Sequence, residues 1–135
     1  MNAKDVRMFS KAEEVSECSG HYKFKIGSII TKGRKIISSG FNSLQKTHPI
    51  QAQYAQLVGR PEAIFLHAEM AALVEANSKG IDTNGAEIYV FRRGLAGDIR
   101  MARPCKICMR ALIEHGIRKI HYTTDFGYAK EEIIK

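Results

Sequence analysis

Two stretches, His67-Ala68-Glu69 and Pro104-Cys105-Lys106-Ile107-Cys108, decide how this chain must fold. The histidine offers an imidazole nitrogen and the two cysteines offer thiolate sulfurs, which are ligand atoms that zinc favours. Three protein ligands leave the fourth position of a tetrahedral site open, whereas structural zinc sites usually close with four. We therefore expect the fold to bring two distant segments together around one zinc ion per chain, held by His67, Cys105 and Cys108.

Glu69 is the candidate acid/base residue of this site. Zinc lowers the pKa of a bound water from about 15.7 toward roughly 7. A carboxyl group beside such a water can accept its proton and deliver it to a reacting molecule. Because a water bound at the open position must pass its proton to a base, we assign Glu69 this role rather than the role of a zinc ligand.

Both motifs are expected at the amino ends of helices. Cys105 and Cys108 are spaced i, i+3 and share one face of a helix, and Pro104 suits the entrance of that helix. A helix amino terminus also favours the thiolate form of cysteine. His67 and Glu69 are spaced i, i+2, so they converge only if His67 lies at or before the first turn of the helix-prone segment that follows. The sequence thus predicts two helix amino termini that point at one metal.

The remaining pattern predicts alternating helices and strands. Helices are expected over 3–18, 67–78, 105–115 and 129–135, and strands over 24–31, 34–39, 86–91 and 119–123; the segment 51–58 is either a short helix or an ordered insert. This order predicts an α/β fold with three α-β-α layers around a mixed four- to five-stranded sheet. Strands joined by helices should be parallel. Because the chain ends at Lys135, we do not expect a complete fifth strand.

The bulk properties fit one domain over residues 1–135. The net charge of +7 favours nucleotides or nucleic acid as partners, although it also suits a simply well-solvated surface. No apolar run is long enough to span a membrane, and no signal peptide is apparent, so we expect a cytoplasmic location. Cys18 is expected to be a lone reduced thiol. Four histidines lack motif partners and are expected to be surface or packing residues: His21, His48, His115 and His121.

From about Ile26 to Tyr122 the chain resembles the cytidine and deoxycytidylate deaminase superfamily. Three segments carry the resemblance: Gly40-Phe41-Asn42, His67-Ala68-Glu69 and Pro104-Cys105-Lys106-Ile107-Cys108. An H-x-E motif followed by P-C-x-x-C is the signature of zinc-dependent nucleobase deaminases. The resemblance implies a cytidine deaminase-like fold with the zinc ligands and acid/base residue named above. It also implies that the Ala68 backbone N–H binds the base carbonyl and that Asn42 contacts the sugar or base. Asn42 could instead be a turn residue.

Two loops offer further substrate contacts. Arg103 lies in a basic loop that should border the site and suits a phosphate group, unless this loop is simply solvated. Arg92, Arg93 and Arg100 flank the site in the same way. Phe126, after the last predicted strand, could stack on the base or cover the end of the sheet.

Three functions are compatible with these residues. The leading hypothesis is zinc-dependent hydrolytic deamination of a cytosine nucleoside or nucleotide, of the dCMP or cytidine type, to the uracil product and ammonia. The second is deamination of a base in RNA or single-stranded DNA, such as adenosine in tRNA or cytosine in a polynucleotide. The third is a non-catalytic zinc or redox protein that uses Cys105 and Cys108. The expected partner is a small nucleoside or nucleotide, with nucleic acid as the alternative, no membrane, and by analogy a homo-oligomeric assembly.

Overall fold

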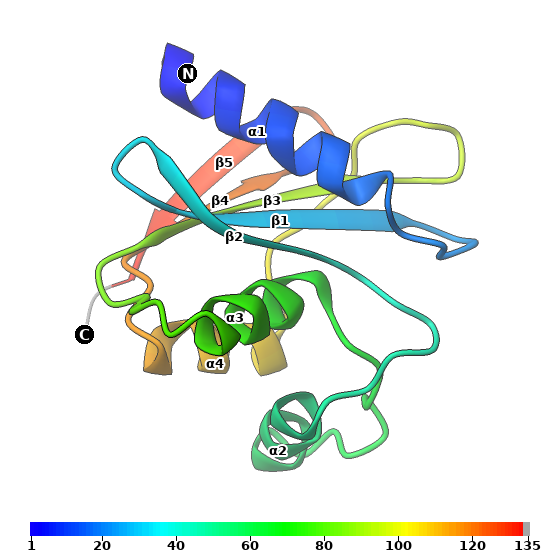
Figure 1. The fold of residues 1–135 in the computed structure, drawn as a ribbon. Coiled ribbons are helices and arrows are strands. Elements are labelled where there is room, and N and C mark those ends of the chain that lie inside the picture. Colours follow the sequence, from blue (N-terminus) through cyan, green and yellow to red (C-terminus); the bar gives the residue numbers. More distant parts are fainter. Residues whose placement is uncertain (134–135) are drawn as a thin grey trace.

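One mixed sheet forms the middle layer of the computed structural model, which describes residues 1–133 (Figure 1). Within these residues the sheet has five strands in the order β2-β1-β3-β4-β5. Their bounds are β1 Lys25–Lys32, β2 Lys35–Phe41, β3 Glu87–Arg93, β4 Lys119–Thr123 and β5 Tyr128–Glu132. The β3–β4 pair is parallel, as predicted for strands joined by a helix, and the other pairs are antiparallel.

Helices cover both faces of the sheet, which confirms the predicted three layers (Figure 1). Helix α1 (Ala3–Ser16) packs on one face, against β1 and β3. Helices α3 (Ala68–Ser78) and α4 (Lys106–Glu114) lie on the opposite face, and α2 (Pro49–Leu57) packs against α4 from outside. Each face therefore has its own helical cover.

The central strands are apolar on both sides because both faces are covered. Successive side chains of a strand point to opposite faces. In β3, Ile88 and Val90 join the core beneath α3 and α4, whereas Tyr89 and Phe91 pack against Phe9 of α1. This two-sided burial explains the nearly continuous apolar runs of the sequence.

Two glycines allow the helices to lie directly on the sheet. A Cβ atom at Gly40 in β2 would lie 2.5 Å from both the Ala68 oxygen and the Ala72 nitrogen of α3. A Cβ atom at Gly27 in β1 would lie 2.3 Å from the Ala12 oxygen of α1. The Ser28 hydroxyl also donates to the Ala68 carbonyl at 2.9 Å. The first turn of α3 is thus fixed on the sheet by close backbone contact.

The end of the chain differs from the prediction. We expected a helix over 129–135 and no complete fifth strand, but Tyr128–Glu132 forms β5, antiparallel to β4. The run Ala129-Lys130-Glu131 has good helix propensity, yet the free edge of β4 supplies backbone partners that a helix would leave unpaired. Residues 134–135 lie outside the described residues.

No helix within residues 1–133 combines the length and the apolar character needed to cross a membrane.

Candidate metal centre and active site

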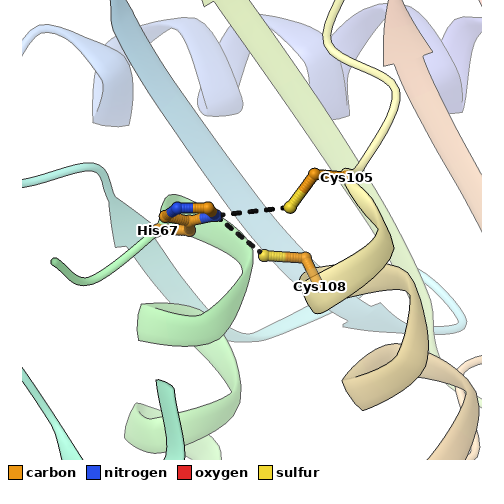
Figure 2. A group of neighbouring side chains, drawn as sticks. All are labelled: His67, Cys105 and Cys108. Atoms are coloured by element: carbon orange, nitrogen blue, oxygen red, sulfur yellow. Dashed lines mark hydrogen bonds between the residues drawn. The ribbon is translucent and has the colours of Figure 1, made fainter. Parts of the chain in front are cut away.

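The amino ends of α3 and α4 converge beneath the sheet. His67 is the N-cap of α3 and Cys105 is the N-cap of α4, both with extended backbone. Neither side chain makes a capping hydrogen bond to its own helix. Both are therefore free to point into the space between the helices, where Cys108 from the first turn of α4 joins them (Figure 2). The predicted pair of helix amino termini is present.

The distances among the three side chains fit one zinc ion. His67 Nδ1 lies 3.6 Å from Cys105 Sγ and 3.3 Å from Cys108 Sγ (Figure 2). All three ligand atoms lie within 4.8 Å of one another. Around a tetrahedral zinc, bonds of about 2.3 Å to sulfur and 2.0–2.1 Å to nitrogen place these atoms roughly 3.5 Å apart. The donor set and its spacing therefore match a zinc site with three protein ligands.

The site also favours the charged form of one sulfur. A hydrogen bond from the Cys108 thiol, together with one from His67, lowers the pKa of Cys105 to about 3. The same sulfur–sulfur contact and complete burial raise the pKa of Cys108. The pKa of His67 is raised, chiefly by its hydrogen bond to Cys105. The thiolate form of Cys105 is the form that a zinc ion binds.

Glu69 lies in the first turn of α3 and is only 6% exposed. Burial raises the pKa of its carboxyl group to about 7, although the charge of His67 opposes this shift. A carboxyl group that is readily protonated and deprotonated near neutral pH is suited to carry protons. This position supports the acid/base role that the sequence suggested.

A cavity of about 310 Å³ opens above these groups. His67, Ala68, Glu69 and Cys105 line its inner end. Its walls are mostly apolar, with two arginines: Ile26, Leu44, Phe65, Leu66, Arg92 and Arg103. A mostly apolar cavity with a few convergent polar groups is typical of small-molecule sites.

Asn42 lines this cavity, but its side chain also joins the strands. Its amide oxygen accepts from the Ile26 N–H at 2.9 Å, and its amide nitrogen donates to the Phe24 carbonyl at 3.3 Å. Its backbone carbonyl accepts from the Ser19 hydroxyl. Asn42 therefore fixes the cavity wall, in addition to any contact with a ligand.

Arg103 and Phe126 lie in different surroundings. Arg103 lines the cavity, and its guanidinium binds the Glu131 carboxylate through two hydrogen bonds of 2.6 and 3.1 Å. The Tyr122 hydroxyl donates to the same carboxylate. Phe126 is 99% exposed in the loop between β4 and β5, and it does not line the cavity. The structure thus brings Asn42, Ala68 and Arg103 to the site and leaves Phe126 outside it.

Among the wall residues that the sequence did not predict, two rings pack against each other. His21 and Phe24 come from the loop between α1 and β1, and their rings stack with centroids 4.2 Å apart. His21 was expected to be a surface or packing residue because it has no motif partner. It does pack, on Phe24, and its Nδ1 also accepts from the backbone N–H groups of Lys23 and Phe24, which holds the loop together. The aromatic side chains that precede β1, which are His21, Tyr22 and Phe24, were the feature of the sequence that could have indicated this wall.

One histidine and two cysteines that could hold a zinc ion, with a buried glutamate beside them, are the groups that zinc-assisted hydrolysis requires. Comparison with known families agrees: residues 2–124 match the model for the cytidine and deoxycytidylate deaminase zinc-binding region. The chain belongs to this family. Membership of this family favours the two deaminase hypotheses over a non-catalytic zinc or redox protein.

Individual relatives are more distant. ComE operon protein 2 of Bacillus subtilis (strain 168) is 27% identical over 113 residues, which are 81% of this chain and 54% of that protein. The chain thus spans about half the length of this curated relative. Among solved structures, the apo form of the dCMP deaminase of cyanophage S-TIM5 has a TM-score of 0.66 at 22% identity. The match covers 92% of this chain and 86% of the cyanophage chain. The cytidine deaminase of Burkholderia pseudomallei has a TM-score of 0.65 at 16% identity, with coverage of 98% of this chain and 93% of that chain. These structures share the cytidine deaminase-like fold.

Proposed function

We propose that this chain hydrolyses the exocyclic amine of cytosine in a nucleoside or nucleotide, giving the uracil product and ammonia. The observation that carries the proposal is the buried Glu69 beside a three-ligand zinc site at the inner end of a cavity. The cyanophage dCMP deaminase was also crystallised in complex with dCMP and dUMP, and it shares this fold with a TM-score of 0.66. That complex supports a pyrimidine nucleotide as the ligand class.

The residues of this chain would share the chemistry as follows. Zinc, held by His67, Cys105 and Cys108, would supply an activated water at neutral pH. Glu69 accepts a proton from the attacking water and delivers it to the ring nitrogen beside the attacked carbon. Glu69 would then carry the second proton, from the hydroxyl group added to the ring, to the amine; the C–N bond breaks, the amine leaves as ammonia, and the new C–O bond becomes the carbonyl of the product.

Binding of the base would rest on the amino end of α3 and the cavity walls. The Ala68 backbone N–H is one of the first N–H groups of the helix, which have no partner within it, and we propose that it donates to the base carbonyl. Asn42 would contact the sugar or base from a side chain already fixed by β1. Arg103 would bind a phosphate if the nucleotide displaces Glu131. Because Phe126 lies outside the cavity, we do not propose that it stacks on the base.

A substrate panel tests this proposal. Zinc-loaded protein is incubated with cytidine, deoxycytidine, CMP, dCMP and cytosine, and ammonia release is measured. We expect turnover of at least one nucleoside or nucleotide. The Glu69→Gln variant should keep its zinc and its fold while kcat falls about 10²–10⁴-fold. Absence of turnover on every compound, or full activity of the variant, would reject the proposed reaction.

We also propose a cytoplasmic location, because the thiol ligands remain reduced there. The expected homo-oligomer stays a prediction.

A further inference from the structure

Three neighbouring cavities share wall residues, and together we call them the groove. The metal-site cavity shares Phe24, Arg92 and Met101 with a second cavity of about 660 Å³. That second cavity shares Lys23 and Phe24 with a third, of about 250 Å³, which reaches Tyr22. Small-ligand sites have volumes of about 300–1,000 Å³, so the first cavity alone is large enough for a small ligand. The two neighbouring cavities are additional space beside the metal site.

A stack of planar groups forms one wall of this groove. Arg92 Cζ lies 4.3 Å from the centroid of the Phe24 ring, Phe24 stacks on His21 at 4.2 Å, and His21 stacks on Tyr22 at 5.4 Å. The His21 and Tyr22 rings are nearly parallel, with an interplanar angle of 6°. Tyr22 ends the stack and is 68% exposed. An exposed ring already held in place offers a stacking surface at a small entropic cost.

Hydrogen bonds within the loop hold this stack in position. The Lys23 and Phe24 N–H groups donate to His21 Nδ1 at 3.1 and 3.3 Å. The His21 N–H in turn donates to the Ser19 hydroxyl at 3.2 Å. The groove wall is therefore built by its own backbone and does not depend on a ligand to form it.

The groove also carries positive charge that no carboxylate neutralises. Within residues 1–133, Lys23 and Arg92 take part in no ion pair, whereas Arg100 pairs with Asp98 and Asp125. The Arg92 Nε is buried and has no hydrogen-bond partner among those residues. The Arg92 Nη1 donates to the Met101 carbonyl at 3.4 Å, so the guanidinium is held at the cavity wall while its charge stays without a carboxylate partner in the described part of the chain.

We propose that this groove binds single-stranded nucleic acid, with a cytosine in the metal cavity and its neighbouring nucleotides along the stack. Bases stack on aromatic side chains without regard to sequence, and cations along a groove follow the phosphates. The net charge of +7 complements such a polyanion. The strand must be unpaired because a base in a duplex cannot reach a metal at the inner end of a cavity. The choice of cytosine as the target base rests on the proposed function. This inference extends the substrate of that reaction from a free nucleotide to a nucleotide within a strand.

The first test is binding, because binding does not require turnover. Fluorescence anisotropy with a labelled oligothymidine strand, which contains no target base, measures affinity at several salt concentrations. We expect affinity that falls with salt, with each phosphate contact contributing about 0.7 to the slope of the logarithmic plot. Tyr22→Ala should weaken binding about 10-fold, and Tyr22→Phe should restore it. Lys23→Gln should reduce the salt slope.

The matched control is Lys35→Gln, which removes one exposed lysine at the start of β2, beside the turn from β1. It should leave binding unchanged. No binding by the wild-type protein, or an equal loss in Lys35→Gln, would overturn the inference.

The second test separates this inference from the proposed function. Zinc-loaded protein is given dCMP and, separately, an oligothymidine strand with one internal cytosine. We expect both to be converted, and the ratio of kcat/KM for the strand to that for dCMP should fall about 10-fold in Tyr22→Ala. If dCMP is converted and the cytosine in the strand is not, the proposal that the groove binds a strand is rejected and the proposed function stands. No turnover of either, with strand binding that depends on Tyr22, would reject the proposed reaction and support the groove.

Discussion

Replacing Gly40 with alanine should weaken zinc binding although it touches no ligand. The new Cβ atom would lie 2.5 Å from the Ala68 oxygen and the Ala72 nitrogen, both backbone atoms of α3. Backbone cannot rotate away as a side chain can, so the helix must move from the sheet. Overpacking of this kind costs about 1–3 kcal/mol and occasionally more. Because the displaced end of α3 carries His67, we expect zinc affinity to fall about 10–100-fold, the range seen for residues that orient metal ligands.

Gly27→Ala is the matched control for this change. Its Cβ atom would lie 2.3 Å from the Ala12 oxygen and the Ser16 nitrogen of α1, on the opposite face of the sheet. Both variants should lower the free energy of unfolding, measured by urea denaturation, by similar amounts. Competition with a chromophoric chelator then measures zinc affinity, which only Gly40→Ala should lose. Equal zinc affinity in the two variants would refute the view that close packing on β2 positions the metal ligand.

Three further predictions follow from the surroundings of single side chains. Burial lowers the pKa of His121 from its ordinary value of 6.5. Burial alone would raise the pKa of Glu87, but the hydrogen bond from His121 and the charges of Lys4 and Arg118 lower it below its ordinary value. The unfolded chain therefore binds more protons, so stability should fall as the pH drops below about 6.5, and Glu87→Gln should flatten the lower part of a plot of melting temperature against pH. Glu131→Gln should free Arg103 and lower KM for dCMP but not for deoxycytidine, with less than about 1 kcal/mol lost in stability because the ion pair is exposed. Cys18 is exposed and apart from the metal site, so Cys18→Ser should leave the zinc content, measured by atomic absorption, unchanged.

The metal centre could be predicted because its chemistry restricts both residue type and spacing. His67 and Glu69 cannot share a helix face, so His67 was expected at or before the first turn of its helix, and the structure has it as the N-cap. Cys105 and Cys108 share a face at the start of α4, as their spacing indicated. Local rules were sufficient here because each ligand is placed by the first turn of its own helix.

The remaining site depends on contacts between distant segments, which local rules do not contain. The segment 129–135 has the composition of a helix, and only the free edge of β4 makes part of it a strand. The carboxylate of Glu131 reaches Arg103 because of that strand, so the ion pair could not be foreseen either. His21 lines the cavity through backbone hydrogen bonds within its loop, which no periodicity predicts.

The open coordination position is the central claim, and X-ray absorption at the zinc edge tests it most directly. Zinc-loaded protein should contain one zinc per chain with two sulfur ligands at about 2.3 Å and two nitrogen or oxygen ligands at about 2.0–2.1 Å. His67→Ala should lose most of its zinc affinity, and an added azide or cyanide ion should change the spectrum of the wild-type protein by entering the fourth position. A third sulfur, or a spectrum that such ligands leave unchanged because a fourth side chain closes the site, would contradict the account.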